Sequence, residues 1–142
     1  MQNKSDFKIL AIDDDKDILL LLRYNLESEG YNVETASSGK KGISLAQKSD
    51  PDLILIDIMM PEMDGIQTCI KLREIDNLKS SHILFLTARA EEYSEVAAFD
   101  AGADDYITKP IKPRALISRI NSFYKKTSAK VKSSKSLQVG DL

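Results

Sequence analysis

The chain lacks the residues that build disulfide frameworks, secretion signals and membrane spans. Its 142 residues include one cysteine, Cys69, so no internal disulfide can form, and a reducing compartment is favoured. The polar N-terminus is not followed by the apolar stretch of a secretory signal. The apolar run at residues 18–22 stops at Arg23 and is far too short to cross a bilayer. We therefore expect a cytoplasmic protein with no membrane contact.

The chain also has no large excess of charge of either sign, and it has only one histidine. Twenty Lys and Arg residues stand against 22 Asp and Glu residues, which gives a formal net charge of −2. This balance argues against nucleic-acid binding by this chain alone, because such binding normally needs a basic face. The histidine, His82, precedes an apolar run and is expected at the surface, outside any site.

Strand and helix patterns alternate along almost the whole chain. Apolar or alternating runs predict five strands, at residues 7–12, 31–36, 53–56, 82–86 and 104–108. Helical patterns follow them, at residues 17–29, after Ser38, after Gly65, and at residues 91–101 and 113–126. Five such units predict an α/β fold of the flavodoxin-like (βα)5 type, a three-layer sandwich with helices on both faces of a parallel sheet.

Residue patterns within the helices predict which faces are buried. Asp15 is expected to cap the first helix and Ser38 the second, and Gly30 is expected to end the first helix in a left-handed conformation. The third helix is expected to turn Ile66, Cys69, Ile70 and the aliphatic stem of Arg73 inward. The last helix carries one continuous apolar stripe, formed by Leu116, Ile117, Ile120, Phe123 and Tyr124.

The order of the strands decides which residues meet. The second strand alternates apolar and polar residues like an edge strand, whereas the first and third are apolar throughout. This pattern favours the order 2-1-3-4-5, which places the first and third strands side by side. In open parallel sheets, sites form beyond the carboxyl ends of the strands at such a switch point.

Three carboxylates, a lysine and a threonine are thus expected at one end of the sheet. Asp13, Asp14 and Asp57 cannot all stay ionised side by side without a cation, and ligands that are all oxygen favour a hard ion such as Mg²⁺. Lys109 adds an ammonium group and Thr87 a hydroxyl donor. Around one carboxylate, these groups form a clamp for a transferring phosphoryl group. Asp57 is then the expected nucleophile, because a carboxylate needs no general base at neutral pH.

Several short motifs, in this order, resemble those of the receiver domain of a two-component response regulator over residues 7 to about 126. They are Asp13-Asp14, then Asp57 with Met60-Pro61 and Gly65 after it, then Thr87-Ala88, and then Lys109-Pro110. The resemblance implies that Asp57 accepts phosphate from the phosphohistidine of a sensor histidine kinase. It implies Mg²⁺ ligands in Asp14, Asp57 and the Met59 carbonyl, with Asp13 assisting. The chain would not be an enzyme beyond its own phosphorylation and dephosphorylation.

The resemblance also implies a conformational switch. Thr87 would move toward the phosphoryl group and Tyr106 would rotate inward, which changes the surface formed by the fourth helix, the fifth strand and the fifth helix.

Residues 102–110 resemble, more narrowly, receivers of the OmpR/PhoB type. In that type, phosphorylation favours a homodimer held by charge pairs across the same surface. Asp105 and Arg119 match one such pair. The usual partners for the other pairs are absent at three positions, Glu95, Ala115 and Asn121.

The resemblance divides the chain into three segments. Residues 1–126 form the receiver domain, and residues 127–136 are a Ser- and Lys-rich linker. Residues 137–142 resemble the first strand of a winged-helix DNA-binding domain, so the chain would contact DNA only through a C-terminal domain that it lacks.

Three alternatives have different requirements. A stand-alone receiver, acting only through protein contacts or a phosphorelay, would not need the segment 137–142. A flavin-binding electron carrier needs a loop rich in Ser, Thr and Gly where this chain has Asp13, Asp14 and Asp15. An aspartyl phosphatase usually has a second Asp two residues after the nucleophile, where this chain has Met59.

Overall fold

A computed structural model describes residues 3–88 and 100–140, with side chains described as far as residue 128. Five parallel strands form one sheet in the order β2-β1-β3-β4-β5, which confirms the predicted topology. The strands are β1 (Lys8–Ile12), β2 (Asn32–Ala36), β3 (Leu53–Asp57), β4 (His82–Thr87) and β5 (Asp105–Thr108). The described α-helices are α1 (Lys16–Ser28), α2 (Gly39–Ser49), α3 (Gly65–Arg73) and α5 (Pro113–Gly140). Two short 3₁₀ helices lie at Lys4–Asp6 and Asp76–Leu78.

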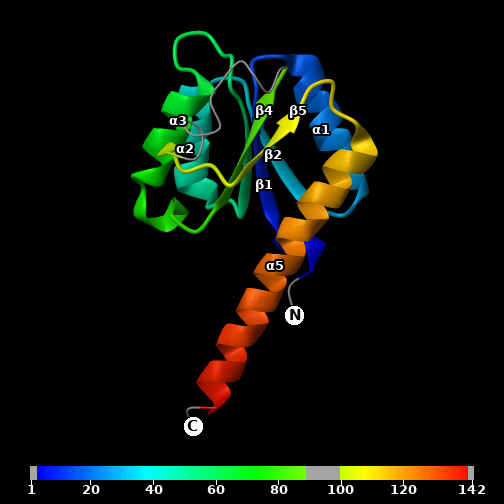
Figure 1. Ribbon diagram of the computed structural model, residues 1–142, viewed down its shortest axis with the longest axis vertical. Helices are drawn as coiled ribbons and strands as arrows, with labels where there is room; N and C mark the ends of the chain where they lie inside the picture. Colours follow the sequence, from blue (N-terminus) through cyan, green and yellow to red (C-terminus); the bar gives the residue numbers. More distant parts are fainter. Residues whose placement is uncertain (1–2, 89–99, 141–142) are drawn as a thin grey trace.

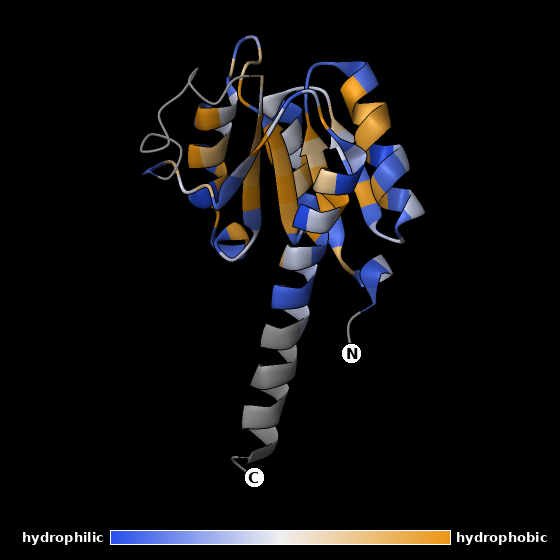
Figure 2. Cartoon of the chain, turned by 45° about the vertical axis from the view of Figure 1, so that its right-hand side comes forward, coloured by the Kyte–Doolittle hydropathy of each residue, from blue (hydrophilic) through white to orange (hydrophobic). Residues whose placement is uncertain are grey.

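The helices cover both faces of the sheet (Figure 1). Helices α1 and α5 lie on one face, and α2 and α3 lie on the other. Every residue of β3 is buried, because helices pack above and below this central strand. Figure 2 shows the apolar strands of the sheet enclosed between helices. The sheet therefore separates two apolar cores, and its edge strands β2 and β5 are less buried than the central β3.

The first two helices begin at the capping residues that the sequence predicted, and the first ends at the predicted glycine. Asp15 caps α1, where its side chain accepts hydrogen bonds from the amides of Asp17 and Ile18. Ser38 caps α2 by accepting from the amide of Lys41. Gly30 has φ of 105°, the left-handed conformation that a residue with a side chain rarely adopts. These positions confirm the predicted boundaries of the first two helices.

The apolar stripe of α5 is confirmed, but the inner face of α3 was predicted one position off. Cys69 is buried as expected, whereas Ile70 is 46% exposed and Leu72 is fully buried. Successive residues of a helix point in directions 100° apart. A small rotation of α3 about its axis therefore turns one residue away from the core and the next residue toward it. The predicted helix at residues 91–101 lies almost entirely outside the described residues.

Helix α5 continues to Gly140, so the prediction of a helix that ends near Lys126 was wrong. The assignment of residues 127–136 to a linker stays a prediction. Residues 127–139 contain no Pro or Gly, and nothing in that segment stops a helix that has already begun. The assignment of residues 137–142 to a further domain stays a prediction. Among the described helices, none combines the length and the apolar character of a membrane span.

His82 is not the surface residue that its place in the sequence suggested. Its ring packs against Phe123 of α5 with a centroid separation of 4.8 Å, and its Nε2 lies 3.0 Å from the Thr127 hydroxyl. Burial lowers the pKa of His82. Helix α5 crosses the start of β4, and its residues partly cover the His82 side chain.

Candidate functional site

The predicted site lies at the carboxyl ends of three neighbouring strands. Ile12 of β1 pairs with Ile56 of β3, so Asp13 and Asp57, each the next residue along, lie side by side. Asp57 in turn pairs with Leu86 of β4, which places Thr87 one residue beyond it. The parallel register thus brings together residues that are far apart in the sequence.

Two of the acidic side chains are buried. Asp13 is fully buried and Asp57 is 5% exposed, whereas Asp14 faces solvent. One carboxylate oxygen from each of the three lies within 4.8 Å of the others, a spacing that suits a single metal ion. The exposed Asp14 leaves the cluster open on one side, so an ion or a small anion can enter from solvent.

Lys109 supplies positive charge to this cluster. Its Nζ atom donates to Asp13 Oδ2 at 3.1 Å and to Asp57 Oδ1 at 3.2 Å. Its backbone amide donates to the Thr87 carbonyl at 2.6 Å, which anchors the segment that follows β5 to the end of β4. The peptide bond from Lys109 to Pro110 is cis. One ammonium group therefore bridges two carboxylates that belong to different strands.

The charges at the site are unbalanced. Burial, and after it the charge of Asp13, raises the pKa of Asp57 to about 6, although Lys109 opposes the shift. Burial alone would lower the pKa of Lys109, but its hydrogen bond to Asp13 and the charges of both acids outweigh burial and raise it. Three carboxylates and one ammonium leave negative charge that a divalent cation can neutralise.

The loop after Asp57 is held against the strand by close backbone contacts. The amide of Ile58 donates to the Leu86 carbonyl, and the amide of Gly65 donates to the Ile58 carbonyl at 2.8 Å. A Cβ atom at Gly65 would lie 2.4 Å from the Asp57 carbonyl oxygen, so only glycine fits here. Asp64 then caps α3 through a capping box with Gln67. The loop that carries Met59 is thereby fixed at both ends.

Thr87 and Met59 differ in their surroundings. Thr87 is 1% exposed and pairs in register with Thr108 of β5. The side chain of Met59 is 66% exposed, so any role for this residue at the metal must come from its backbone carbonyl, as the sequence suggested. That carbonyl as a metal ligand stays a prediction.

A family model of the response regulator receiver domain matches residues 9–121 of the chain. The chain belongs to this family.

Three similar proteins are longer than this chain. The alkaline phosphatase synthesis transcriptional regulatory protein PhoP of Bacillus subtilis is 42% identical over 127 residues, which cover 89% of this chain and 52% of PhoP. The transcriptional regulatory protein ResD of the same organism is 41% identical over 90% of this chain and 52% of its own length. SrrA of Staphylococcus aureus is 42% identical over 86% of this chain and 49% of its own length. The chain thus spans about half the length of the curated relatives it matches, all three of which are named as transcriptional regulators.

Solved receiver structures share the fold. A CheY-like receiver domain protein from Methanospirillum hungatei superposes with a TM-score of 0.81 at 31% identity, over 87% of this chain and 98% of its own. The chemotaxis protein CheY4 of Vibrio cholerae gives 0.78 at 31% identity, over 82% and 98%. The receiver domain of DrrB, activated with BeF3, gives 0.74 at 30% identity, over 84% and 97%.

The predicted switch residue Tyr106 and the two predicted dimer residues lie together on β5 and α5. Tyr106 pairs with Phe85 of β4 and packs, partly buried, against the core under α2 and α3. Arg119 forms an ion pair with Asp105 at 2.5 Å and donates to the Tyr106 carbonyl at 3.1 Å. A groove of about 370 Å³ lies between β5 and α5 here. The charge pair that the sequence assigned to a dimer is therefore already formed within one chain.

One residue whose polar role the sequence did not predict holds the loop before β5. Arg73, at the end of α3, donates from Nε to the Gly102 carbonyl at 2.8 Å and pairs with Asp104 at 3.1 Å. Its Nη1 atom donates to the Leu78 and Ser81 carbonyls as well. Only the charge of Arg73, at the end of a helix expected to pack inward, hinted at this role. It fixes the backbone that leads to Tyr106.

Proposed function

We propose that this receiver accepts a phosphoryl group on Asp57 from the phosphohistidine of a sensor histidine kinase, in a reaction that depends on Mg²⁺. The observation that carries the proposal is the bridge from Lys109 to Asp13 and Asp57 at the end of the sheet. A buried carboxylate with an adjacent ammonium, a hydroxyl on the next strand and two further acids matches the requirements of phosphoryl transfer.

Asp57 is the nucleophile in this proposal. Its pKa of about 6 leaves it mainly ionised at neutral pH, so no base is required. A carboxylate oxygen attacks phosphorus, the phosphorus–nitrogen bond of the phosphohistidine breaks, and its electron pair returns to the imidazole ring. The product is an acyl phosphate, which hydrolysis later returns to carboxylate and phosphate. The chain would thus act only on its own phosphorylation state, not as an enzyme on other substrates.

The acidic cluster fits a magnesium ion. Its ligand atoms are all oxygen, and no histidine or cysteine lies among them. Asp13, Asp14, Asp57 and the Met59 carbonyl would hold the ion. When bound, Mg²⁺ supplies positive charge to the phosphoryl oxygens.

Lys109 and Thr87 would orient the phosphoryl group. The ammonium of Lys109 already donates a hydrogen bond to Asp57. From this position it can donate to a phosphoryl oxygen instead. Thr87 would donate its hydroxyl from the neighbouring strand, and Tyr106, one strand further, would follow this movement.

The output would be a homodimer formed across β5 and α5, in a cytoplasmic transcriptional regulator that contacts DNA through a domain outside this chain. The relatives named as transcriptional regulators, and their greater length, support this part of the proposal. For Asp105 and Arg119 to pair between two chains, their ion pair within one chain must open or be shared.

The test is incubation with acetyl phosphate, with and without Mg²⁺, followed by measurement of intact mass. We expect one phosphoryl adduct that requires Mg²⁺ and is absent from Asp57→Asn. Asp64→Asn, which changes an acid of the same loop outside the cluster, should be labelled normally. An adduct on the Asp57→Asn protein would refute the assignment of the acceptor.

A further inference from the structure

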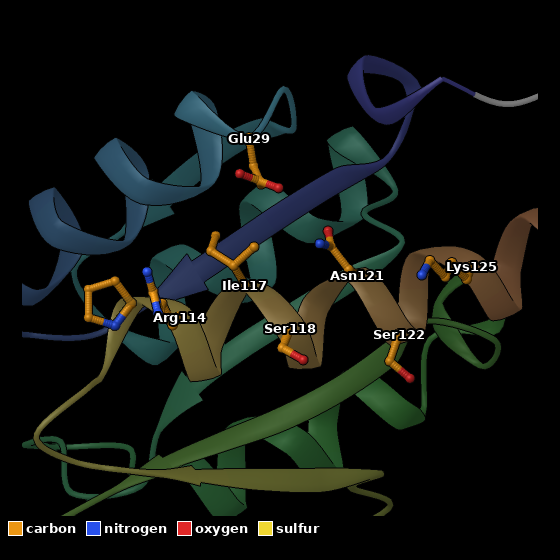
Figure 3. A pocket seen from close by; sticks show the side chains of 8 residues that line it. Glu29, Arg114, Ile117, Ser118, Asn121, Ser122 and Lys125 are labelled. Carbon is orange, nitrogen blue, oxygen red and sulfur yellow. The ribbon is translucent and has the colours of Figure 1, made fainter.

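A second groove lies on the opposite side of α5 from Asp105 and Tyr106. It is about 620 Å³ in volume and runs between α5 and the end of α1. Figure 3 shows Glu29 at the end of α1 pointing toward α5, from which Arg114, Ile117, Ser118 and Lys125 reach the groove. None of these residues takes part in the proposed phosphoryl transfer.

The groove is positively charged on an otherwise acidic protein. Arg114 and Lys125 are both exposed, and among the described residues no carboxylate is hydrogen-bonded or ion-paired to either. The acid of the groove, Glu29, is paired with Lys4 at 3.3 Å. The sequence of α5 contains no Asp or Glu in its 28 residues. Two cations thus face solvent without a counter-charge while the whole chain carries a net charge of −2.

One residue that lines the groove is tied to the rest of the fold, and another is apolar. Tyr31 donates its hydroxyl hydrogen to Asn121 Oδ1, which fixes the middle of α5 to the segment after α1. The rings of Phe7, Tyr31 and Tyr124 pack with centroid separations of 5.6 to 5.8 Å in the core on this face of the sheet. Ile117 lies partly buried between the two cations along the helix. The position of α5 beside the end of α1 is therefore set before a partner binds.

We propose that this groove binds an acidic helical segment of a partner protein. Arg114 and Lys125 stand eleven positions apart on one helix, which corresponds to about 16 Å at 1.5 Å per residue. A helix lying along α5 with carboxylates separated by this distance and an apolar side chain between them would pair with both cations and cover Ile117. The hydroxyl groups of Ser118 and Ser122 line the same path.

Two other occupants fit less well. A second copy packed antiparallel on α5 would place Arg114 of one chain near Lys125 of the other, which brings like charges together. Duplex DNA presents a wide convex surface of phosphates, whereas this groove runs between α5 and the end of α1.

The experiment uses a fluorescein-labelled helical peptide of about 16 residues, with glutamates at both ends of one face and leucine between them. Its binding to the whole chain is measured by fluorescence anisotropy, beside a peptide in which glutamine replaces glutamate. Two double variants with the same change in net charge are compared. One is Arg114→Glu with Lys125→Glu, in the groove. The other is Lys112→Glu with Lys126→Glu, whose side chains are exposed but lie outside the groove.

We expect the acidic peptide to bind and the groove variant to weaken binding about tenfold, with little effect from the control variant or from the glutamine peptide. Both variants should be labelled on Asp57 like the unchanged chain, since neither alters the acidic cluster. Absence of peptide binding, or equal loss in both variants, would overturn the proposal.

Two further measurements separate the other occupants. Tighter binding of a duplex DNA probe than of the peptide would assign the groove to nucleic acid and overturn the proposal. Sedimentation that reveals a dimer of the unphosphorylated chain, lost in the groove variant alone, would assign the groove to a second copy instead.

Discussion

The two ends of the sheet differ in what they bury. At the carboxyl end, Asp13 and Asp57 are buried beside one ammonium group, that of Lys109. At the amino end, the rings of Phe7, Tyr31 and Tyr124 pack edge to face or tilted, and the Tyr31 hydroxyl has a partner in Asn121.

The difference separates stability from reactivity. Apolar rings and satisfied hydroxyls stabilise the amino end whatever the phosphorylation state. Like charges at the carboxyl end oppose folding, and a cation or a phosphoryl group with its counter-ion changes that balance. We infer that the aromatic end of the sheet offsets the electrostatic cost of the reactive end.

The largest effect is expected at the amino end. Phe7→Ala removes a fully buried ring that contacts Tyr31 and Tyr124 and should lower the free energy of unfolding by about 4 kcal/mol. Urea denaturation followed by circular dichroism measures this, with Tyr24→Ala, at a residue 73% exposed, as the control. Where the variant is still folded, labelling of Asp57 should be unchanged. A loss of labelling without a loss of stability would mean that the two ends are not separate.

A smaller loss is expected from removal of the bridging cation. Lys109→Ala leaves Asp13 and Asp57 buried without a counter-charge and should cost about 3 kcal/mol in the presence of EDTA. Added Mg²⁺ should recover part of this loss, because an ion bound only by the folded state stabilises it. Lys112→Ala, three residues later and exposed, should change stability by less than about 0.5 kcal/mol. Equal unfolding midpoints for both variants would show that Lys109 is not needed to balance the acids.

The smallest effect is a gain in stability that depends on pH. The pKa of Asp57 is raised from 3.8 to about 6, so the folded state binds the proton of this carboxyl group more tightly than the unfolded state does. The stability that results is fully present below pH 3.8 and is lost as pH rises through 6. Asp57→Asn has no such group to titrate. In EDTA, the variant should therefore become more stable than the unchanged chain, by at most about 3 kcal/mol at pH 8, with almost no difference near pH 3. Thermal unfolding at several pH values measures the difference, and parallel curves would contradict the raised pKa.

Much of the site was predictable because it depends on local signals. Each of Asp13, Asp57 and Thr87 directly follows or ends an apolar run, and the carboxyl ends of parallel strands necessarily share an edge. The motif order then identified the receiver family, which the match over residues 9–121 confirmed. The role of Arg73 was not predictable, because its carbonyl partners come from loops whose path the sequence does not specify.

The sequence by itself determined the order of strands and helices, the helix caps at Asp15 and Ser38, and the residues that end each strand, because these depend on neighbours along the chain. Only the tertiary structure decided that Ile70 faces solvent, that His82 lies under α5, and that Arg119 pairs with Asp105 of its own chain. Each of these depends on the rotation of a helix or on its crossing over the sheet. Rotation and crossing are set by packing between distant segments, for which a pattern along the chain carries no direct signal.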